Sequence, residues 1–240
     1  MNWANERGVA DEAHIDKFVT EMGGERVDRR FPNARFPNAD YIFAKDKILI
    51  ELKILETEFG DTEALQQREL ALMEEVARKF GAGPILRGEP EVQRHWAKAK
   101  FNHYRIPLCR IVDKANRQLR ATKAALGDDA YRGLVWLVND NFRGIGTDLA
   151  MGLLVTTVGQ RNPHVDGLIY VTNHYVDFPS DDYARLVWAP IYPDDADQDL
   201  GEFVDRLGAA WFRYQARIIG PMDDSQSGPD ILLRGARPIL

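Results

Sequence analysis

The chain has 240 residues, 45% of them hydrophobic, which is enough to form one sizeable core. Its formal net charge is −6, so its overall field does not attract nucleic acid, and a polyanion would have to bind a local patch. The single cysteine, Cys109, excludes a disulfide within the chain and favours a reducing compartment. The first residues are polar and acidic, unlike a secretion signal, and no apolar run reaches the length of a membrane span. We therefore expect a soluble cytoplasmic protein with no membrane partner.

The first half of the chain predicts a helix followed by a strand-rich segment. Apolar residues recur with helical spacing over 8–22, and the glycine pair after them predicts the helix end. Residues 25–44 predict a strand, a loop and a second strand, and the apolar run at 47–55 predicts a third strand. A helix is expected at about 62–80, before a cluster of glycine and proline.

The second half predicts alternating helices and strands. Residues 90–105 are basic with interleaved aromatic side chains. The elements expected after them are a helix at 111–126, a buried strand at 133–140, a helix at about 147–159, a strand at 167–176 and an amphipathic helix at 199–217. The middle three of these predict a β-α-β unit.

The strand at 47–55 carries two charges in an apolar setting. Because side chains alternate between the faces of a strand, Glu51 and Lys53 point from one face while the neighbouring apolar residues line the other. A turn at Lys45-Asp46 sets the register so that Asp40 falls opposite Glu51, with Cβ atoms about 4.5 to 5.5 Å apart. Two carboxylates at that separation repel each other unless a lysine or a divalent metal ion lies between them.

This arrangement resembles a known nuclease motif. Asp40, ten further residues and then Glu51-Leu52-Lys53 resemble the signature of the PD-(D/E)XK nuclease superfamily, which has the restriction-endonuclease-like fold. The proline of that motif is displaced here, because Pro37-Asn38-Ala39 precedes Asp40. The core of the family is a helix, a three-stranded meander, a second helix and a strand parallel to the sheet, and the predicted elements follow that order.

The resemblance covers roughly the first 140 residues and implies one α/β domain over 1–240. It implies a restriction-endonuclease-like core, with a mixed β-sheet flanked by helices, built from about 8–55 and 111–140. A helical insertion is expected at about 56–110, and a C-terminal α/β extension at about 141–240.

The resemblance also implies a Mg²⁺- or Mn²⁺-dependent endonuclease that hydrolyses phosphodiester bonds in DNA. Asp40 and Glu51, with the backbone carbonyl of Leu52, would hold the metal ion, which polarises the phosphate and activates a water. Lys53 would position or deprotonate that water and stabilise the developing negative charge.

Two helices are expected to add further residues to this site. The first helix of the family often supplies an acid, and Glu12 is the first choice, ahead of Asp16 one turn later. The second core helix often supplies a glutamine or lysine, and Gln118 is the best match, ahead of Arg117 and Lys114.

An acidic protein needs a local basic strip to approach DNA, and the expected phosphate contacts are Arg94, Lys98, Lys100 and Arg117. The simpler alternative is a solvated basic helix face. The catalytic residues have simpler alternatives too: Glu51 and Lys53 as a solvated pair, Asp40 as a turn residue, and Glu12 as a surface acid.

Two rival functions stay open. One is a catalytically inactive module of the same fold that binds nucleic acid or a partner protein, although the complete Asp-Glu-Lys set argues against lost activity. The other is an RNA-directed nuclease of a toxin or defence system.

The helix at 199–217 carries Trp211, Phe212 and Tyr214 close together, and this aromatic ridge predicts an exposed interface. A twofold dimer would supply two sites for double-strand cleavage, so we expect a homodimer. The competing explanation is that the ridge is buried within the monomer.

Overall fold

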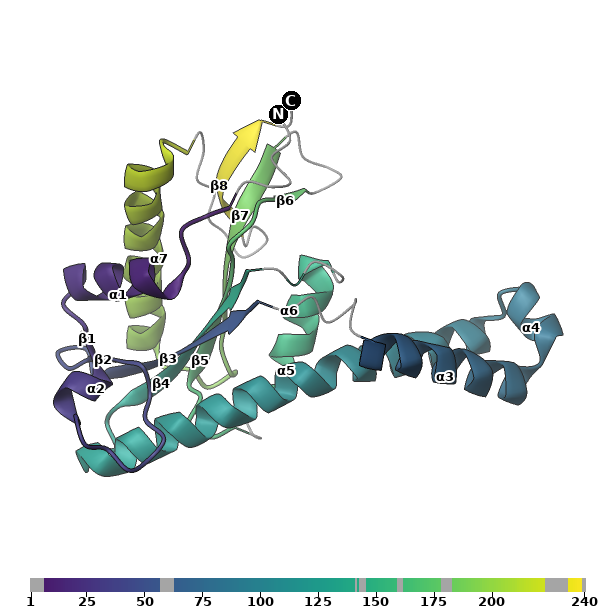
Figure 1. Ribbon diagram of the computed structural model, residues 1–240, viewed down its shortest axis with the longest axis horizontal. Helices are drawn as coiled ribbons and strands as arrows, with labels where there is room; N and C mark the ends of the chain where they lie inside the picture. Colours follow the sequence, from purple (N-terminus) through teal and green to yellow (C-terminus); the bar gives the residue numbers. More distant parts are fainter. Residues whose placement is uncertain are drawn as a thin grey trace.

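The computed structural model describes residues 7–56, 63–140, 142, 146–158, 162–177, 183–222 and 233–238, without the side chains of 64, 65, 148 and 233–238. In this part of the chain, a layered body carries a long helical arm that projects to one side (Figure 1). A search of the same residues for a helix long and apolar enough to cross a membrane finds none.

The body is organised around one mixed sheet. Its strands are β1 (Glu25–Arg26), β2 (Tyr41–Phe43), β3 (Ile48–Leu55), β4 (Arg132–Asn139), β5 (Gly167–Thr172), β6 (Val176–Asp177), β7 (Tyr183–Ile191) and β8 (Leu233–Pro238). They follow the order β1-β2-β3-β4-β5-β7-β6, with β8 also paired to β7. The first three strands are antiparallel neighbours, whereas β3, β4 and β5 run parallel to one another. The last three strands, β6, β7 and β8, again pair in antiparallel fashion.

The helices are α1 (Glu12–Glu21), α2 (Val27–Arg30), α3 (Glu63–Phe80), α4 (Ala82–Leu86), α5 (Pro90–Leu126), α6 (Thr147–Val155) and α7 (Gln198–Ile219). The Asp11 side chain caps α1 by accepting a hydrogen bond from the backbone N–H of His14. Gly127, in the left-handed conformation with φ of 63°, ends α5, as glycine often does.

Helices cover both faces of the sheet. Ile15 and Phe18 of α1 and Trp211 of α7 pack on one face, in a core that includes Trp136 of β4. On the other face, α5 and α6 pack through residues such as Leu119 and Leu153. The result is a helix–sheet–helix arrangement, which confirms the expected α/β class and the mixed sheet flanked by helices.

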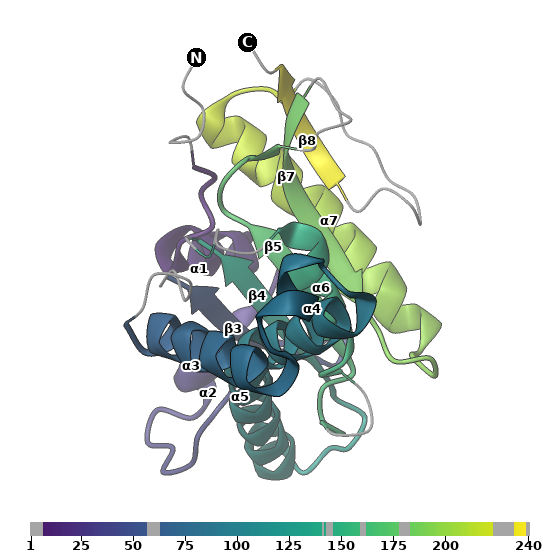
Figure 2. The same cartoon turned by 90° about the vertical axis from the view of Figure 1, so that its right-hand side faces the viewer.

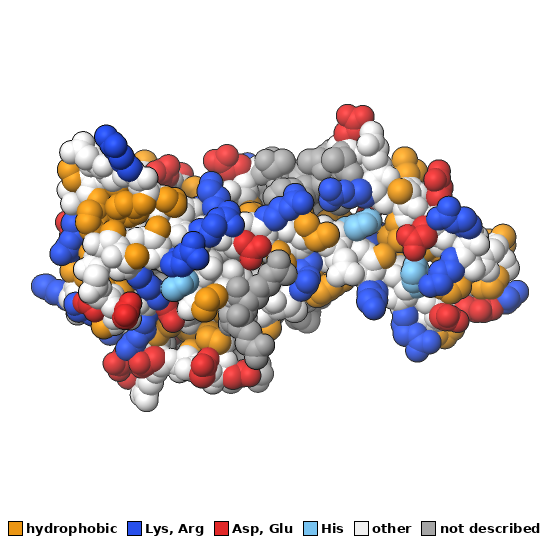
Figure 3. All heavy atoms as spheres, turned by 90° about the horizontal axis from the view of Figure 1, so that it is seen from below, with side chains coloured by type: hydrophobic (Ala, Val, Ile, Leu, Met, Phe, Trp, Pro, Cys, Tyr) orange, Lys and Arg blue, Asp and Glu red, His pale blue; other side chains and the backbone are white. Residues whose placement is uncertain are grey.

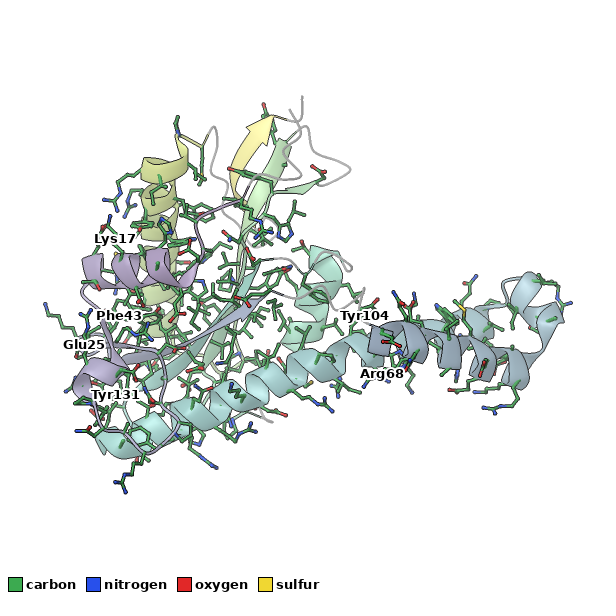
Figure 4. The ribbon with its side chains drawn as sticks, in the orientation of Figure 1. Lys17, Glu25, Phe43, Arg68, Tyr104 and Tyr131 are labelled. Atoms are coloured by element: carbon green, nitrogen blue, oxygen red, sulfur yellow. The ribbon has the colours of Figure 1, made fainter. Side chains whose placement is uncertain are left out.

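The arm consists of α3, α4 and the first part of α5. Figure 2, which views the molecule from the side of the arm, shows α3 lying beside α5, with α4 close to them. Leu72, Val76 and Val92 form its small buried core, with Trp96 partly buried against them. Tyr104 lies where α5 leaves the body, near Arg68 at the base of the arm (Figure 4). The arm therefore stands outside the main hydrophobic cores.

Several predicted boundaries differ from the structure. The expected insertion at 56–110 and the core helix at 111–126 meet within a single helix, because α5 runs without a break through Pro107. Between β1 and β2, the predicted loop contains the short helix α2. The strand expected at 167–176 ends at Thr172.

The sequence reading missed β7, a long strand between β5 and β6. Pro190 lies inside it, and an internal proline argues against a central strand because it donates no hydrogen bond. The structure accommodates Pro190 because β6 and β8 pair only with residues 183–187, so this end of β7 has a neighbour on one side.

The predicted exposed aromatic ridge on α7 was wrong. Trp211, Phe212 and Tyr214 are all buried in the monomer, with exposed fractions of 0, 8 and 2%. The physical reason is that α7 turns this side toward the sheet, where Trp211 meets Trp136 and Phe18. The aromatic residues therefore give no argument for an interface, and the homodimer stays a prediction.

Candidate active site

The β2–β3 hairpin brings two carboxylates together. Tyr41 pairs with Ile50, which confirms the predicted register and places Asp40 opposite Glu51. The backbone N–H of Asp40 donates to the carbonyl of Ile50 at 3.1 Å, and its carboxylate Oδ2 accepts from the N–H of Leu52 at 2.8 Å. Because the N–H and C=O of one strand residue point to the same side, the Leu52 carbonyl also faces the edge where Asp40 lies.

Lys53 connects the strand to α5. Its Nζ donates a hydrogen bond to Glu51 Oε1 and a second one, 3.2 Å long, to Gln118 Oε1. The Gln118 amide in turn donates to the carbonyl of Asn38 at 3.0 Å. The structure thus brings Asp40, Glu51, Lys53 and Gln118, four of the expected site residues, into one cluster on the α5 face of the sheet.

Glu51 is the least solvated member of the cluster. Its exposed fraction is 0%, and its Oε2 atom has no hydrogen-bond partner among the residues that the structure describes. Burial, followed by the negative charge of Asp40, raises the pKa of Glu51 to about 8. Burial also raises the pKa of Asp40, against the opposing effects of the Leu52 N–H and the positive charge of Lys53. A buried carboxylate with an unsatisfied oxygen is costly unless a cation joins it.

This donor set fits a hard divalent cation. Asp40, Glu51 and the carbonyl of Leu52 offer oxygen ligands at one edge of β3, and the open oxygen of Glu51 is available for coordination. Among the described residues, no group of three or more His, Cys, Asp or Glu side chains is placed to hold a metal ion. Two carboxylates suffice for Mg²⁺, because that ion keeps several of its waters and binds through one or two carboxylates.

The acids of α1 are engaged elsewhere. Glu12 and Asp16 both accept hydrogen bonds from Arg26 Nη1, at 3.0 to 3.1 Å, and Asp16 also accepts one of 2.6 Å from the Tyr41 hydroxyl. The Glu12 side chain is 62% exposed, and its negative charge adds to burial in raising the pKa of Asp40, so Glu12 lies near the cluster. In this arrangement Glu12 accepts a hydrogen bond from Arg26, and its catalytic role stays a prediction.

Arg26 is the residue that the sequence reading missed. It lies on β1, next to β2, and its positive charge opposes the rise in the pKa of Asp40. The hydrogen bond that Arg26 donates to Glu12, together with those to Asp16, raises the pKa of Arg26 above its ordinary value. The sequence does show a charged residue, Arg26, in a predicted strand beside the apolar Val27, which could have marked it as a site residue. Its partners Glu12 and Asp16, however, lie on another element, α1.

The four expected phosphate contacts do not form one surface. Arg117 is exposed on α5 directly beside Gln118. Lys100 is held by Glu69 of α3 at 3.2 Å. Arg94 and Lys98 are exposed on the arm, 24 and 20 residues before Gln118 on the same helix, which corresponds to about 30 Å or more along its axis.

Comparisons with known proteins add no relative to this picture. No protein-family model matches the chain, and neither curated proteins nor solved structures show a significant match to it.

Proposed function

We propose that the protein is a metal-dependent nuclease of the PD-(D/E)XK type that hydrolyses phosphodiester bonds in DNA. The observation that carries the proposal is the cluster of Asp40, Glu51, Lys53 and Gln118, in which the buried Glu51 Oε2 has no hydrogen-bond partner in the described part of the chain. The element order α1, β1–β2–β3, α5, β4, with β4 parallel to β3, supports a restriction-endonuclease-like fold for the first part of the chain.

Each residue of the cluster then has a chemical role. Asp40, Glu51 and the Leu52 carbonyl would hold a Mg²⁺ or Mn²⁺ ion, which supplies charge neutralisation at the phosphate and lowers the pKa of a bound water. Lys53 Nζ orients the attacking water and stabilises negative charge that develops on the phosphate oxygens. Gln118 fixes the position of the Lys53 ammonium group.

A substrate panel tests the proposal. The protein is incubated with plasmid DNA, single-stranded DNA and RNA, each with Mg²⁺, with Mn²⁺ or with EDTA. We expect DNA to be cleaved with either metal and to stay intact with EDTA. Metal-dependent cleavage of RNA alone would show that the substrate is RNA rather than DNA. The absence of cleavage in every combination would favour an inactive binding module.

A further inference from the structure

The charge of the protein is distributed unevenly, and α5 is its basic element. The whole chain has 31 Lys and Arg residues against 37 Asp and Glu residues. The single helix α5 has nine Lys and Arg residues against two acids, Glu91 and Asp113. Figure 3, which views the molecule from below, the side on which α5 lies in Figure 1, shows Lys and Arg side chains spread across this face.

Three of these residues form a strip beside the candidate active site. Arg110, Lys114 and Arg117 are spaced i, i+4 and i+7, so they lie on one side of the helix. Lys114 is one turn before Gln118, whose side chain reaches Lys53. Around the circumference of α5, Gln118 lies between the buried residues that face the sheet and the three basic residues, which face solvent. We call Arg110, Lys114 and Arg117 the phosphate strip.

The phosphate strip is accessible and its charges are available. All three side chains are exposed. The ion pairs that Lys and Arg residues of α5 form with other described residues are those of Lys100 with Glu69 and Lys123 with Asp166, neither of which involves the strip. Exposed cations that form no ion pair with a described residue attract an external anion.

Three other basic residues of α5 lie on another side of the helix, whereas Lys100, which pairs with Glu69, stands about 40° from Lys114. At 3.6 residues per turn, Arg94, Lys98 and Arg105 stand about 160° to 200° around the helix from Lys114. They therefore point away from the flank on which Gln118 contacts Lys53. One helix thus offers two basic surfaces, of which the phosphate strip alone adjoins the cluster.

The geometry points to the phosphate strip as the surface that holds the polynucleotide strand next to the bond to be cleaved. The strip spans about 10 Å of helix, which matches the axial rise of about three nucleotides of a B-form strand. Non-bridging phosphate oxygens accept hydrogen bonds from guanidinium and ammonium groups, without reading the base sequence. This inference rests on the proposed function for the identity of the cleaved bond, and it names the surface that binds the substrate.

Binding measured without a metal ion separates this inference from the proposed activity. Fluorescein-labelled single-stranded DNA, duplex DNA and RNA of one sequence are titrated with the protein in EDTA, and anisotropy gives the affinity at several salt concentrations between 50 and 200 mM, a conventional range for such measurements. The variant Arg110→Gln/Lys114→Gln/Arg117→Gln is compared with Arg94→Gln/Lys98→Gln/Arg105→Gln, which removes the same number of charges from the same helix.

We expect the strip variant to weaken binding by about 10- to 100-fold and to reduce the salt slope by about 2 to 3. The comparison variant should stay within about threefold of the wild type, because its charges lie far from the cluster. The affinities for single-stranded DNA, duplex DNA and RNA then show which of these polynucleotides the strip binds most tightly. Melting temperatures of both variants, and the single variant Lys114→Glu, check that a loss of binding is not a loss of fold.

Each other outcome gives a definite answer. Equal losses in the two triple variants, or a wild type that binds none of the probes, would overturn the strip. Unchanged binding in the strip variant alongside metal-dependent cleavage by the wild type would overturn the strip and leave the nuclease standing. Loss of binding in the strip variant, with no cleavage under any metal condition, would keep the strip and remove the nuclease.

Discussion

The two faces of the sheet bury side chains equally deeply, but the side chains differ in chemistry: aromatic on one face, acidic on the other. On the face that α1 and α7 cover, Trp136, Trp188 and Trp211 meet edge to face, with ring centroids 5.4 to 5.6 Å apart. On the face that α5 covers, the equally buried Glu51 lies between Asp40 and Lys53. The aromatic face removes large apolar surfaces from water, whereas the acidic face desolvates a carboxylate.

One face of the sheet therefore stabilises the fold, and the other lowers its stability. Tightly packed aromatic side chains contribute free energy of folding and carry no charge, although the indole N–H groups of Trp136, Trp188 and Trp211 are buried without a hydrogen-bond partner among the described residues. A buried carboxylate with an open oxygen lowers the stability of the metal-free fold, and such costs concentrate at functional sites. Each face therefore predicts a different response to mutation, pH and metal ions.

The largest effect is expected on the aromatic face. Trp211→Ala removes a fully buried indole that contacts Trp136 and Phe18, so the free energy of unfolding should fall by about 3–5 kcal/mol. The measurement is urea unfolding followed by circular dichroism. The control is Leu86→Ala, at a side chain that is 85% exposed on α4, where the change should stay within about 0.5 kcal/mol. Similar losses in both variants would show that the aromatic face is not the main store of stability.

The second prediction applies the opposite test to the acidic face. Glu51→Gln should reduce metal-dependent cleavage by at least about 10²- to 10³-fold, because a neutral amide neither holds the cation nor neutralises Lys53. The same variant should unfold at an equal or higher urea concentration, since it removes the cost of ionising a fully buried carboxylate, while Lys53 is 18% exposed and keeps its hydrogen bond to Gln118. Lys45→Met, at an exposed turn residue, is the control and should retain activity. A Glu51→Gln protein that cleaves normally would remove Glu51 from the site.

The third prediction concerns pH. In the folded protein the pKa of Glu51 is about 8, above its ordinary value, so between about pH 5 and pH 8 the folded chain retains a proton that the unfolded chain has released. The free energy of unfolding, measured without metal ions, should therefore fall as the pH rises through that window, by roughly 3–4 kcal/mol. The raised pKa of Asp40 acts in the same direction.

The control for the pH prediction is Glu51→Gln, in which most of the decline should disappear. Unfolding curves at pH 5, 6, 7 and 8 in the two proteins give the comparison. If both proteins lost the same stability across this range, the titration of Glu51 would not be the cause.

The features of the site that the sequence could predict depend on residues close together in the chain. Alternation along β3 and the length of the 44–47 turn are sufficient to place Asp40 opposite Glu51 and to point Lys53 to the same face. Gln118 was expected from the resemblance, as the best match for the residue that the second core helix of the family supplies, and it lies beside the buried residues Ala115 and Leu119 of α5.

The parts that the sequence could not predict depend on contacts between distant elements. The sequence around Glu12 does not show that Arg26 will donate a hydrogen bond to its carboxylate, because that contact requires α1 and β1 to meet at the sheet edge. The burial of Trp211 likewise depends on the side of α7 that faces the sheet, since an aromatic ridge of the same spacing suits either a core or an interface.

The smallest effect is expected from the metal ion itself. A ligand that binds only the folded state at ten times its dissociation constant stabilises a protein by about 1.4 kcal/mol, which for a chain of this size raises the melting temperature by about 3–6 °C. We expect Mg²⁺ to produce a shift of this size in the wild type and none in Asp40→Asn, because one of the two carboxylate ligands is then lost. The shift should also be larger at pH 8 than at pH 6, since the metal ion binds the ionised form of Glu51 and the raised pKa keeps that form scarce at the lower pH. Thermal unfolding of both proteins at the two pH values, with Mg²⁺ and with EDTA, gives the result. An equal Mg²⁺ shift in wild type and Asp40→Asn would place the ion elsewhere on the protein, and a shift independent of pH would separate metal binding from Glu51.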